Sequence, residues 1–288
     1  KLPFVHGLEN TIHISEVDMV IEGKHEGLTE FPSIVAGPVE EQIAESIVDR
    51  MTNGACIQLG VGGMPDAIGK LIAESELKDL GIHTELLVNA YLDMHKAGKI
   101  TNLNKHDIMR GKSVFSIAHG TKELFDWVSD NPSMCCAPIN YVNDLSVIGE
   151  IDNFVSINSC IAVDLFGQIS AESAGTRHIS GTGGQLDFLT AGFKNPRAQS
   201  FIALPSTYTD KKGNLHSNIK PTFTGGDIIT DPRSQAYTMV TEYGIENLAG
   251  ASVWERAEKL ISLAHPDFRE ELIESAKKVN VWRQSNKR

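Results

Sequence analysis

A glycine-rich loop is the first feature of the sequence that could do chemistry. It reads GVGG at residues 60–63 and lies between a predicted strand at 56–59 and a predicted helix from about Asp66. In α/β sheets the backbone N–H groups of such a loop point at a bound anion or a developing oxyanion, and glycine lets the ligand come close. The loop is not a dinucleotide fingerprint, because Pro65 stands where that motif requires glycine. A tight turn that merely needs glycine is the structural alternative.

Three acids near strand ends or glycines are candidates for a reacting group: Glu85, Glu172 and Glu242. A buried lone carboxylate is costly unless it is paired or used, so each acid is either an ordinary strand-end residue or a functional one. Neighbouring parallel strands bring their carboxyl ends to one edge, which allows Glu85 and the loop amides to face one reacting atom. These acids permit acid/base or covalent chemistry without choosing between them.

A second glycine cluster, SGTGGQLDF at residues 180–188, is able to supply another backbone N–H group. It is equally readable as a flexible turn in which Asp187 caps a helix. The sequence holds no GxSxG nucleophile elbow, which disfavours an ordinary serine hydrolase.

The elements that must position these residues predict an α/β fold. Strand 56–59, the helix after the glycine loop and a strand at 84–88 form a βαβ unit, which implies a mostly parallel open sheet with helices on both faces. A helix is predicted from Pro38, because apolar residues recur there every four positions. Strands are also predicted at 11–15, 19–21, 113–118, 154–157, 201–204 and 237–240, with a hairpin at 161–171 and a helical tail over 253–281 that is interrupted at His265-Pro266.

Composition narrows the class of protein. The 288 residues include 26 basic and 37 acidic side chains, a net charge of −11, which disfavours general binding to nucleic acid or anionic lipid. No stretch approaches the roughly 18 apolar residues of a membrane helix. Four cysteines without pairing geometry favour a reducing, cytoplasmic setting. The histidines and cysteines show no metal-ligand spacing, so we expect no metal site.

Five motifs in order resemble one enzyme family. They are QLGVGGMP at 58–65, GIHTE at 81–85, the 180–188 cluster, VTEYG at 240–244 and AHPDFR at 264–269. Together they resemble the acetyl-CoA hydrolase/transferase branch of the class I coenzyme A transferases, most closely the 4-hydroxybutyrate and butyryl-CoA:acetate CoA-transferases. The resemblance runs from about residue 10 to the end of the chain.

The resemblance implies a CoA-transferase in which Glu85 is the nucleophile. Its carboxylate attacks a short-chain acyl-CoA, and a mixed anhydride gives way to a glutamyl-CoA thioester, from which a carboxylic acid such as acetate takes the coenzyme A. Coenzyme A is then a substrate, with no tightly bound cofactor. A carboxylate is a weak nucleophile, so the site must stabilise an oxyanion, and the amides of Val61, Gly62 and Gly184 are suitable donors.

The resemblance also assigns supporting roles. Asn143 and Glu242 match positions near the nucleophile as orienting or auxiliary groups, whereas Glu172 is not the nucleophile. The two glycine segments are expected to contact the coenzyme A substrate, through Gly60, Gly62, Gly63, Gly183, Gly184 and Gln185. Lys212 and Lys220 are named as candidates for binding the phosphates of coenzyme A, with no motif to support them.

The chain departs from the family pattern at Asn89-Ala90, where relatives usually read Asp-Gly beside the site. Residues 1–35 are expected to be the remnant of an amino-terminal domain and a connection, with a catalytic domain at 36–288. Two alternatives stay open: acyl-CoA hydrolysis, and a non-catalytic CoA-binding chain of a split enzyme. A homo-oligomer is expected from the resemblance, with a separate chain or segment as a source of the amino-terminal domain.

Overall fold

An eight-stranded sheet forms the centre of the protein, whose structure is a computed structural model that describes residues 2–24, 26–105, 107–283 and 285. All pairings in this main sheet are parallel except that of the edge strand β15 with β14. The strand order is β15 (Gly244–Asn247), β14 (Thr238–Thr241), β10 (Gln199–Ala203), β5 (Phe154–Ser159), β1 (Cys56–Leu59), β2 (Gly81–Val88), β3 (Ser113–His119) and β4 (Met134–Cys136).

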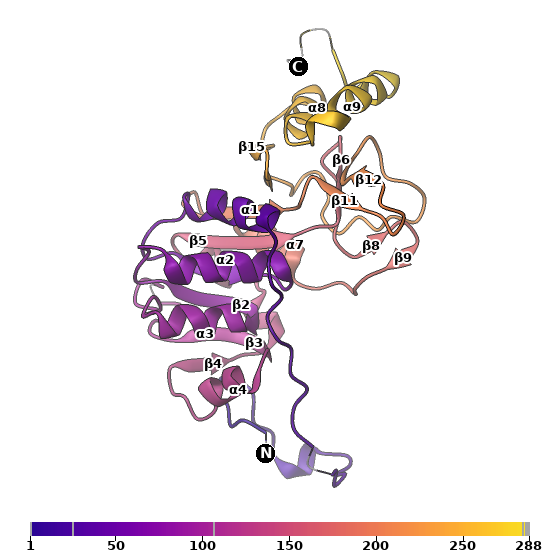
Figure 1. The fold of residues 1–288 in the computed structure, drawn as a ribbon. Helices are drawn as coiled ribbons and strands as arrows, with labels where there is room; N and C mark the ends of the chain where they lie inside the picture. The colour runs from indigo at the N-terminus through magenta and orange to yellow at the C-terminus, as the bar shows by residue number, and fades with distance from the viewer. Residues whose placement is uncertain (1, 25, 106, 284, 286–288) are drawn as a thin grey trace.

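Four helices cover one face of this sheet: α1 (Pro38–Val48), α2 (Gly63–Glu74), α3 (Asn89–Lys96) and α4 (Lys122–Val128). In Figure 1, α1, α2 and α3 lie side by side over the sheet and run roughly along the strand direction. Pro38 occupies the first turn of α1, and Glu40 accepts a hydrogen bond from the backbone N–H of Gly37 at 3.1 Å, so the predicted start of this helix is confirmed. Apolar residues of α1 and α2 pack on Ile57, Leu59 and Ile157.

The opposite face carries α5 (Ile139–Val142), α6 (Leu145–Gly149) and α7 (Gln185–Ala191). Residues of β5 alternate between the two cores, with Phe154 on this face and Val155 and Ile157 on the other. Phe154 stacks on Phe188 of α7 with ring centroids 6.2 Å apart. Helices therefore cover both faces, which confirms the predicted fold class.

Smaller elements and the last two helices build a second core beside β14. They are β6 (Ala162–Asp164), β7 (Ile169–Ser170) and β13 (Ile219–Lys220) in one small sheet, the hairpins β8 (Ser173–Ala174) to β9 (Arg177–His178) and β11 (Thr207–Thr209) to β12 (Leu215–Ser217), and the helices α8 (Val253–Ser262) and α9 (Pro266–Lys278). The predicted hairpin at 161–171 and the interrupted helical tail are thereby confirmed.

The segment before α1 differs from the prediction. Residues 11–15 and 19–21 are not strands; the segment holds one short 3₁₀ turn, η1 (Ile14–Glu16), and Met19, Val20 and Ile21 are exposed. Alternation makes a strand only where a neighbouring strand pairs with it and one face is buried. Residues 11–21 have neither, although Gly7 earlier in the segment forms an isolated bridge with Cys136. Its last part crosses the sheet edge, where the backbone N–H of Phe31 donates to Gly120 and its ring stacks on His119.

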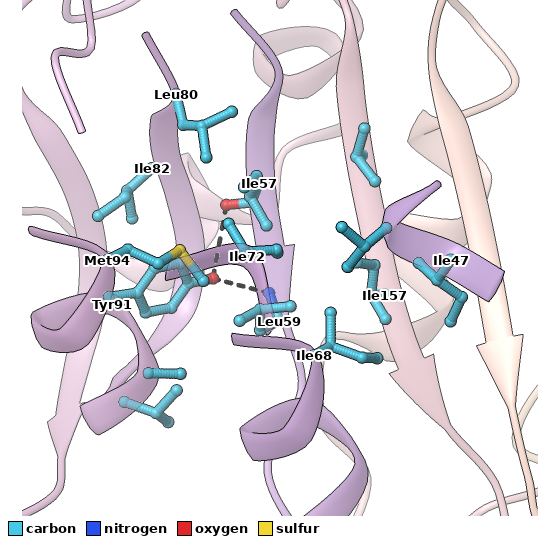
Figure 2. Packing of buried hydrophobic residues seen from close by; sticks show 14 of the residues in the cluster. Ile47, Ile57, Leu59, Ile68, Ile72, Leu80, Ile82, Tyr91, Met94 and Ile157 are labelled. Carbon is cyan, nitrogen blue, oxygen red and sulfur yellow. Dashed lines mark hydrogen bonds between the residues drawn. The ribbon is translucent and has the colours of Figure 1, made fainter. Parts of the chain in front are cut away.

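Tyr91 of α3 fixes the end of the central strand β1. Its hydroxyl accepts a hydrogen bond of 2.7 Å from the backbone N–H of Leu59 and donates to the carbonyl of Ile57 at 3.5 Å, among packed apolar side chains (Figure 2). The ring is fully buried. The strand end that carries the glycine loop is thus tied to the helix that follows β2.

We expect Tyr91→Phe to lower the free energy of unfolding by about 1–3 kcal/mol, because the buried N–H of Leu59 loses its acceptor. Urea unfolding measures this loss. Tyr208→Phe is the control, since that side chain is half exposed, and it is expected to change stability by less than about 0.5 kcal/mol. Equal effects in the two variants would contradict the assignment.

Candidate active site

A pocket of about 290 Å³ opens at the carboxyl edge of the main sheet. Three segments far apart in the sequence meet around it: the end of β1 with the first loop residues Gly60 and Val61, Glu85 and Leu86 of β2, and the turn 180–184 with the first residue of α7. The end of β5 and residues near β7 close the remaining sides. The glycine loop, the carboxylate and the second glycine cluster are therefore at one place, as a parallel sheet requires.

The Glu85 carboxylate is half-buried and held by Asn143. The Nδ2 of Asn143 donates a hydrogen bond of 2.7 Å to Oε2 of Glu85. Asn143 follows directly on α5, beneath the sheet edge. An amide donor fixes one carboxylate oxygen without adding a charge, which leaves the other oxygen available as a nucleophile.

His83 supports this arrangement from two positions earlier on β2. Residues i and i+2 of a strand point to the same face, so His83 and Glu85 both project towards α5. The buried imidazole donates from Nε2 to the carbonyl of Val142 at 2.8 Å, next to Asn143. The pKa of His83 is lowered to about 3, chiefly by burial and also by the nearby charge of Lys105, against the opposing effect of the hydrogen bond to Val142. The ring is therefore neutral and anchors the turn that carries Asn143.

Gly184 packs against both members of this pair. A β-carbon at position 184 would lie 2.2 Å from Oε2 of Glu85 and 2.3 Å from Nδ2 of Asn143, so only glycine fits without moving them. At Gly183 the same atom would lie 3.7 Å from Oε1 of Glu85. Asp187 lies close by on α7; burial raises its pKa, the Asn143 amide lowers it and the charge of Glu85 raises it. The Ser180–Phe188 motif therefore forms one wall of the site.

The loop after β1 forms another wall. Gly62 has a φ of +118°, a conformation that side chains rarely adopt, and it caps the start of α2. Among the described residues, none accepts a hydrogen bond from the backbone N–H of Val61, Gly62 or Gly184. Gly60 lies against Asn158, whose Oδ1 would be 3.2 Å from an added β-carbon. Free donors near a carboxylate are the arrangement that oxyanion stabilisation needs.

A buried amide network forms the floor of the pocket. Gln58 and Asn158 on neighbouring strands exchange hydrogen bonds of 3.0 Å, and Ser156 donates to Gln58 at 2.7 Å. These polar groups satisfy one another, so their burial costs little and their positions are rigid. Gln58 belongs to the QLGVGGMP motif, but nothing in the sequence indicated this network, because its partners Ser156 and Asn158 lie 98 and 100 residues away on another strand.

The structure does not bring every predicted residue together. Glu172 and Gln185 line the pocket, but Glu242 does not. Strands β1, β5 and β10 separate β2 from β14, a lateral distance of about 19 Å at about 4.8 Å per strand. Glu242 instead accepts hydrogen bonds from the backbone N–H and the hydroxyl of Ser206. Gly63 lies at the first residue of α2, where Ile34 packs beside it.

Lys212 and Lys220 also lie outside the pocket lining. Lys220 forms an ion pair of 3.5 Å with Asp227, whose pKa is lowered chiefly by backbone hydrogen bonds against the opposing effect of burial.

The described residues contain no group of three or more metal-ligating side chains. In that same part of the chain, no helix is long and apolar enough to span a bilayer.

The departure Asn89-Ala90 lies at the start of α3, outside the pocket lining. Asn89 donates to the carbonyl of Phe31 at 3.0 Å and accepts from the backbone N–H of Thr121 at 2.9 Å, which clamps the crossing segment to the sheet edge. Ala90 packs against Gly69 of α2, where an added β-carbon would lie 2.2 Å from that of Ala90. Neither residue lines the pocket, so this departure affects the packing of the elements that support the pocket and not its lining.

The fold and the pocket define an α/β protein with a carboxylate set among free backbone amides. The model of the acetyl-CoA hydrolase/transferase C-terminal domain matches residues 120–276. The chain belongs to the acetyl-CoA hydrolase/transferase family.

Relatives match nearly the whole chain. A butyryl-CoA:acetate CoA-transferase of Anaerostipes caccae is 51% identical over 98% of this chain, and a 4-hydroxybutyrate coenzyme A transferase of Clostridium kluyveri is 40% identical over 94%. The crystal structure of RipA from Yersinia pestis is 40% identical and superposes over 97% of this chain with a TM-score of 0.86. The chain spans 63%, 61% and 61% of these proteins, respectively.

The neutral state of His83 predicts a specific loss of stability in acid. In the unfolded chain His83 takes up a proton below its ordinary pKa of 6.5, whereas in the folded chain it stays neutral down to about pH 3. The stability that comes from burying the neutral ring is therefore complete above pH 6.5 and falls as the pH drops below it. His83→Gln keeps a donor for Val142 but cannot titrate. Between pH 7 and 4.5 we expect wild type to lose about 2–3 kcal/mol more than this variant in urea unfolding. Parallel pH curves would contradict the assignment.

Proposed function

We propose that this chain carries the nucleophile of a CoA-transferase that moves coenzyme A between a short-chain acyl-CoA and a carboxylic acid. One observation carries the proposal: the Glu85 carboxylate, held by Asn143, lies in the pocket beside two glycine segments with free amides. Relatives at 51% and 40% identity carry the names of acyl-CoA:carboxylate CoA-transferases, which supports the same chemistry here.

The arrangement suits a weak nucleophile. Attack by a carboxylate builds negative charge on the carbonyl oxygen under attack, and that charge needs donors fixed in advance. The amide N–H groups of Val61, Gly62 and Gly184 are the candidates, because Gly184 touches the carboxylate and the loop borders the same pocket. Losing one such donor typically slows a reaction by about 100-fold to 1,000-fold.

The proposed cycle has four bond exchanges. An oxygen of Glu85 bonds to the thioester carbon of the acyl-CoA, and the thiolate leaves to give a mixed anhydride. The thiolate then attacks the glutamyl carbon, which releases the first carboxylate and leaves a thioester on Glu85. The acceptor carboxylate attacks this thioester and expels the thiolate, giving a second mixed anhydride. The thiolate finally attacks the acceptor's acyl carbon, which frees Glu85.

The glycine segments are the proposed contacts of the coenzyme A substrate. Gly60, Gly183, Gly184 and Gln185 line the pocket, and Gly62 and Gly63 continue the first loop into α2. Glycine permits a thioester to lie against the backbone, as the contact distances at Gly184 illustrate. Binding energy from the unreactive part of coenzyme A would then favour the strained anhydride step.

The lining of the pocket favours a monocarboxylic acyl group. It combines apolar side chains, including Leu59, Val61 and Phe188, with the carboxylates of Glu85 and Glu172. Among the described residues that line it, none is lysine or arginine. A second carboxylate on the acyl chain would meet two negative charges and no partner, which is unfavourable in a partly buried site.

The proposal predicts a covalent adduct on Glu85. We incubate the protein with butyryl-CoA and no acceptor, digest it, and weigh the peptide that contains Glu85. The expected gain is one coenzyme A less one water. The adduct should be absent in Glu85→Gln, which cannot act as a carboxylate nucleophile, and present in Glu123→Gln, a control on the exposed side of α4.

Acceptors then separate the possible reactions. Acetate and butyrate should remove the adduct at least about tenfold faster than succinate at equal concentration, because of the negative pocket. Free coenzyme A that accumulates steadily without any acceptor would favour hydrolysis. Binding of coenzyme A without adduct formation would overturn the proposal in favour of a non-catalytic CoA-binding chain.

Gly184→Ala is expected to slow adduct formation by about 100-fold while the affinity for coenzyme A falls far less, because a methyl group displaces Glu85 and Asn143. Gly181→Ala is the matched control in the same turn, since a β-carbon there meets nothing within 4 Å. Single-turnover mass spectrometry gives the rate, and calorimetry gives the affinity. An equal loss of rate and affinity would count against the inference that Gly184 fixes the position of Glu85 and Asn143.

A further inference from the structure

The turn that carries Gly184 has few side chains that could hold it in place. Residues 180–184 contain Gly181, Gly183 and Gly184, and residues 178–183 are exposed to solvent. Glycine-rich backbone is conformationally free, so an isolated turn of this composition would sample many positions. The contact of Gly184 with Glu85 nevertheless requires a fixed backbone, which must come from outside the turn.

Glu172 holds the first half of the turn. Its backbone carbonyl accepts hydrogen bonds from the N–H groups of Ile179 at 2.8 Å and Ser180 at 3.2 Å. Its side-chain Oε2 accepts from the hydroxyl of Thr182 at 3.1 Å. The residue is 7% exposed, so these bonds form in a partly desolvated place.

Asp231 holds the second half. Its Oδ2 accepts a hydrogen bond of 2.6 Å from Nε2 of Gln185, the residue after Gly184. The backbone of Asp231 is itself fixed, because it exchanges hydrogen bonds with Ile169 of β7 at 3.1 and 3.2 Å. Both anchors therefore connect the turn to the small sheet beside the pocket.

Burial of Asp231 is unfavourable in itself. The residue is fully buried, and its Oδ1 has no hydrogen-bond partner in the described part of the chain. The pKa of Asp231 is raised to about 6, chiefly by burial and also by the charge of Glu172, against the lowering effect of the Gln185 amide. A half-satisfied buried carboxyl costs stability, and packing alone gives no reason for it.

We propose that Glu172 and Asp231 are positioning residues that set the Gly184 backbone against Glu85, through Thr182 and Gln185. This inference rests on the proposed function of Glu85. Neither acid needs to touch the reacting atoms. Both carboxyl groups can therefore lie near Glu85 and hold the turn without acting as alternative nucleophiles. The small sheet thereby determines the geometry of a site whose nucleophile lies on the main sheet.

Gln185→Ala and Asp231→Ala test the inference by the single-turnover rate of adduct formation on Glu85. Both are expected to slow it by about 10-fold to 100-fold, with a larger effect on the rate at saturation than on the half-saturating concentration of butyryl-CoA. Asp231→Asn retains an oxygen acceptor for Gln185 and should restore the rate to within about fivefold of wild type. Gln185 is only partly buried, so its variant stays informative even where Asp231→Ala fails to fold.

The matched control is Gln168→Ala. Gln168 donates to the buried Asp164 at 2.7 Å, the same pairing of amide and carboxyl, but neither residue lines the pocket. It should leave the adduct rate unchanged. A Gln185→Ala rate within twofold of the Gln168→Ala rate would overturn the inference.

Amide hydrogen exchange distinguishes failure of this inference from failure of the proposed function. Peptides covering residues 179–188 should exchange about tenfold faster in Gln185→Ala and in Thr182→Val than in wild type, whereas peptides from β3 should not change. Unchanged exchange would overturn the anchoring whatever the chemistry. If the wild-type protein forms no adduct, the assignment of Glu85 as nucleophile is overturned, and so is the catalytic role of Glu172 and Asp231. Faster exchange in the variants would in that case still establish that Glu172 and Asp231 hold the turn.

Discussion

The site depends on one steric constraint: the backbone of Gly184 lies in contact with the Glu85–Asn143 pair. Each partner reaches this contact from a different element, Glu85 from β2, Asn143 from the end of α5 and Gly184 from the start of α7. A hydrogen bond of 2.7 Å and a gap that excludes a methyl group leave little freedom in their relative positions. The parallel sheet, the stacking of Phe188 on Phe154 and the bond from His83 to Val142 all hold these elements at that spacing.

Buried polar groups surround this contact, and they differ in how well they are satisfied. The Gln58, Ser156 and Asn158 side chains saturate one another on the pocket floor. His83 keeps one unpartnered nitrogen in the described part of the chain, and Asp231 keeps one unpartnered oxygen there. Such groups lower stability and would ordinarily be replaced by apolar ones. Three of the five buried side chains with an unpartnered polar atom in the described part of the chain, His83, Asn143 and Asp231, lie at or next to this site, which indicates that geometry here outweighs stability.

Local patterns in the sequence were sufficient for the βαβ frame, the glycine loop and the helical tail, because each follows from periodicity or from a residue type with a narrow conformational role. They left Glu85 as one of three candidate acids, and only the family resemblance selected it as the nucleophile. The strands predicted at residues 11–15 and 19–21 were wrong, because an alternating pattern does not show whether a neighbouring strand is there to pair with. Glu242 shares a local context with Glu85 but lies several strands away, and chain order does not reveal strand order. His83, Asn158 and Asp231 were missed because their partners lie 59, 100 and 46 residues away.

The contact between Gly69 and Ala90 limits the order in which this chain can change. A methyl group at position 69 would overlap that of Ala90, so an alanine is accommodated at one position only while the other is glycine. Two substitutions that are each harmless in one background are therefore incompatible in another. In this packing alanine at position 90 requires glycine at position 69, so a residue at either position has to be exchanged together with its partner.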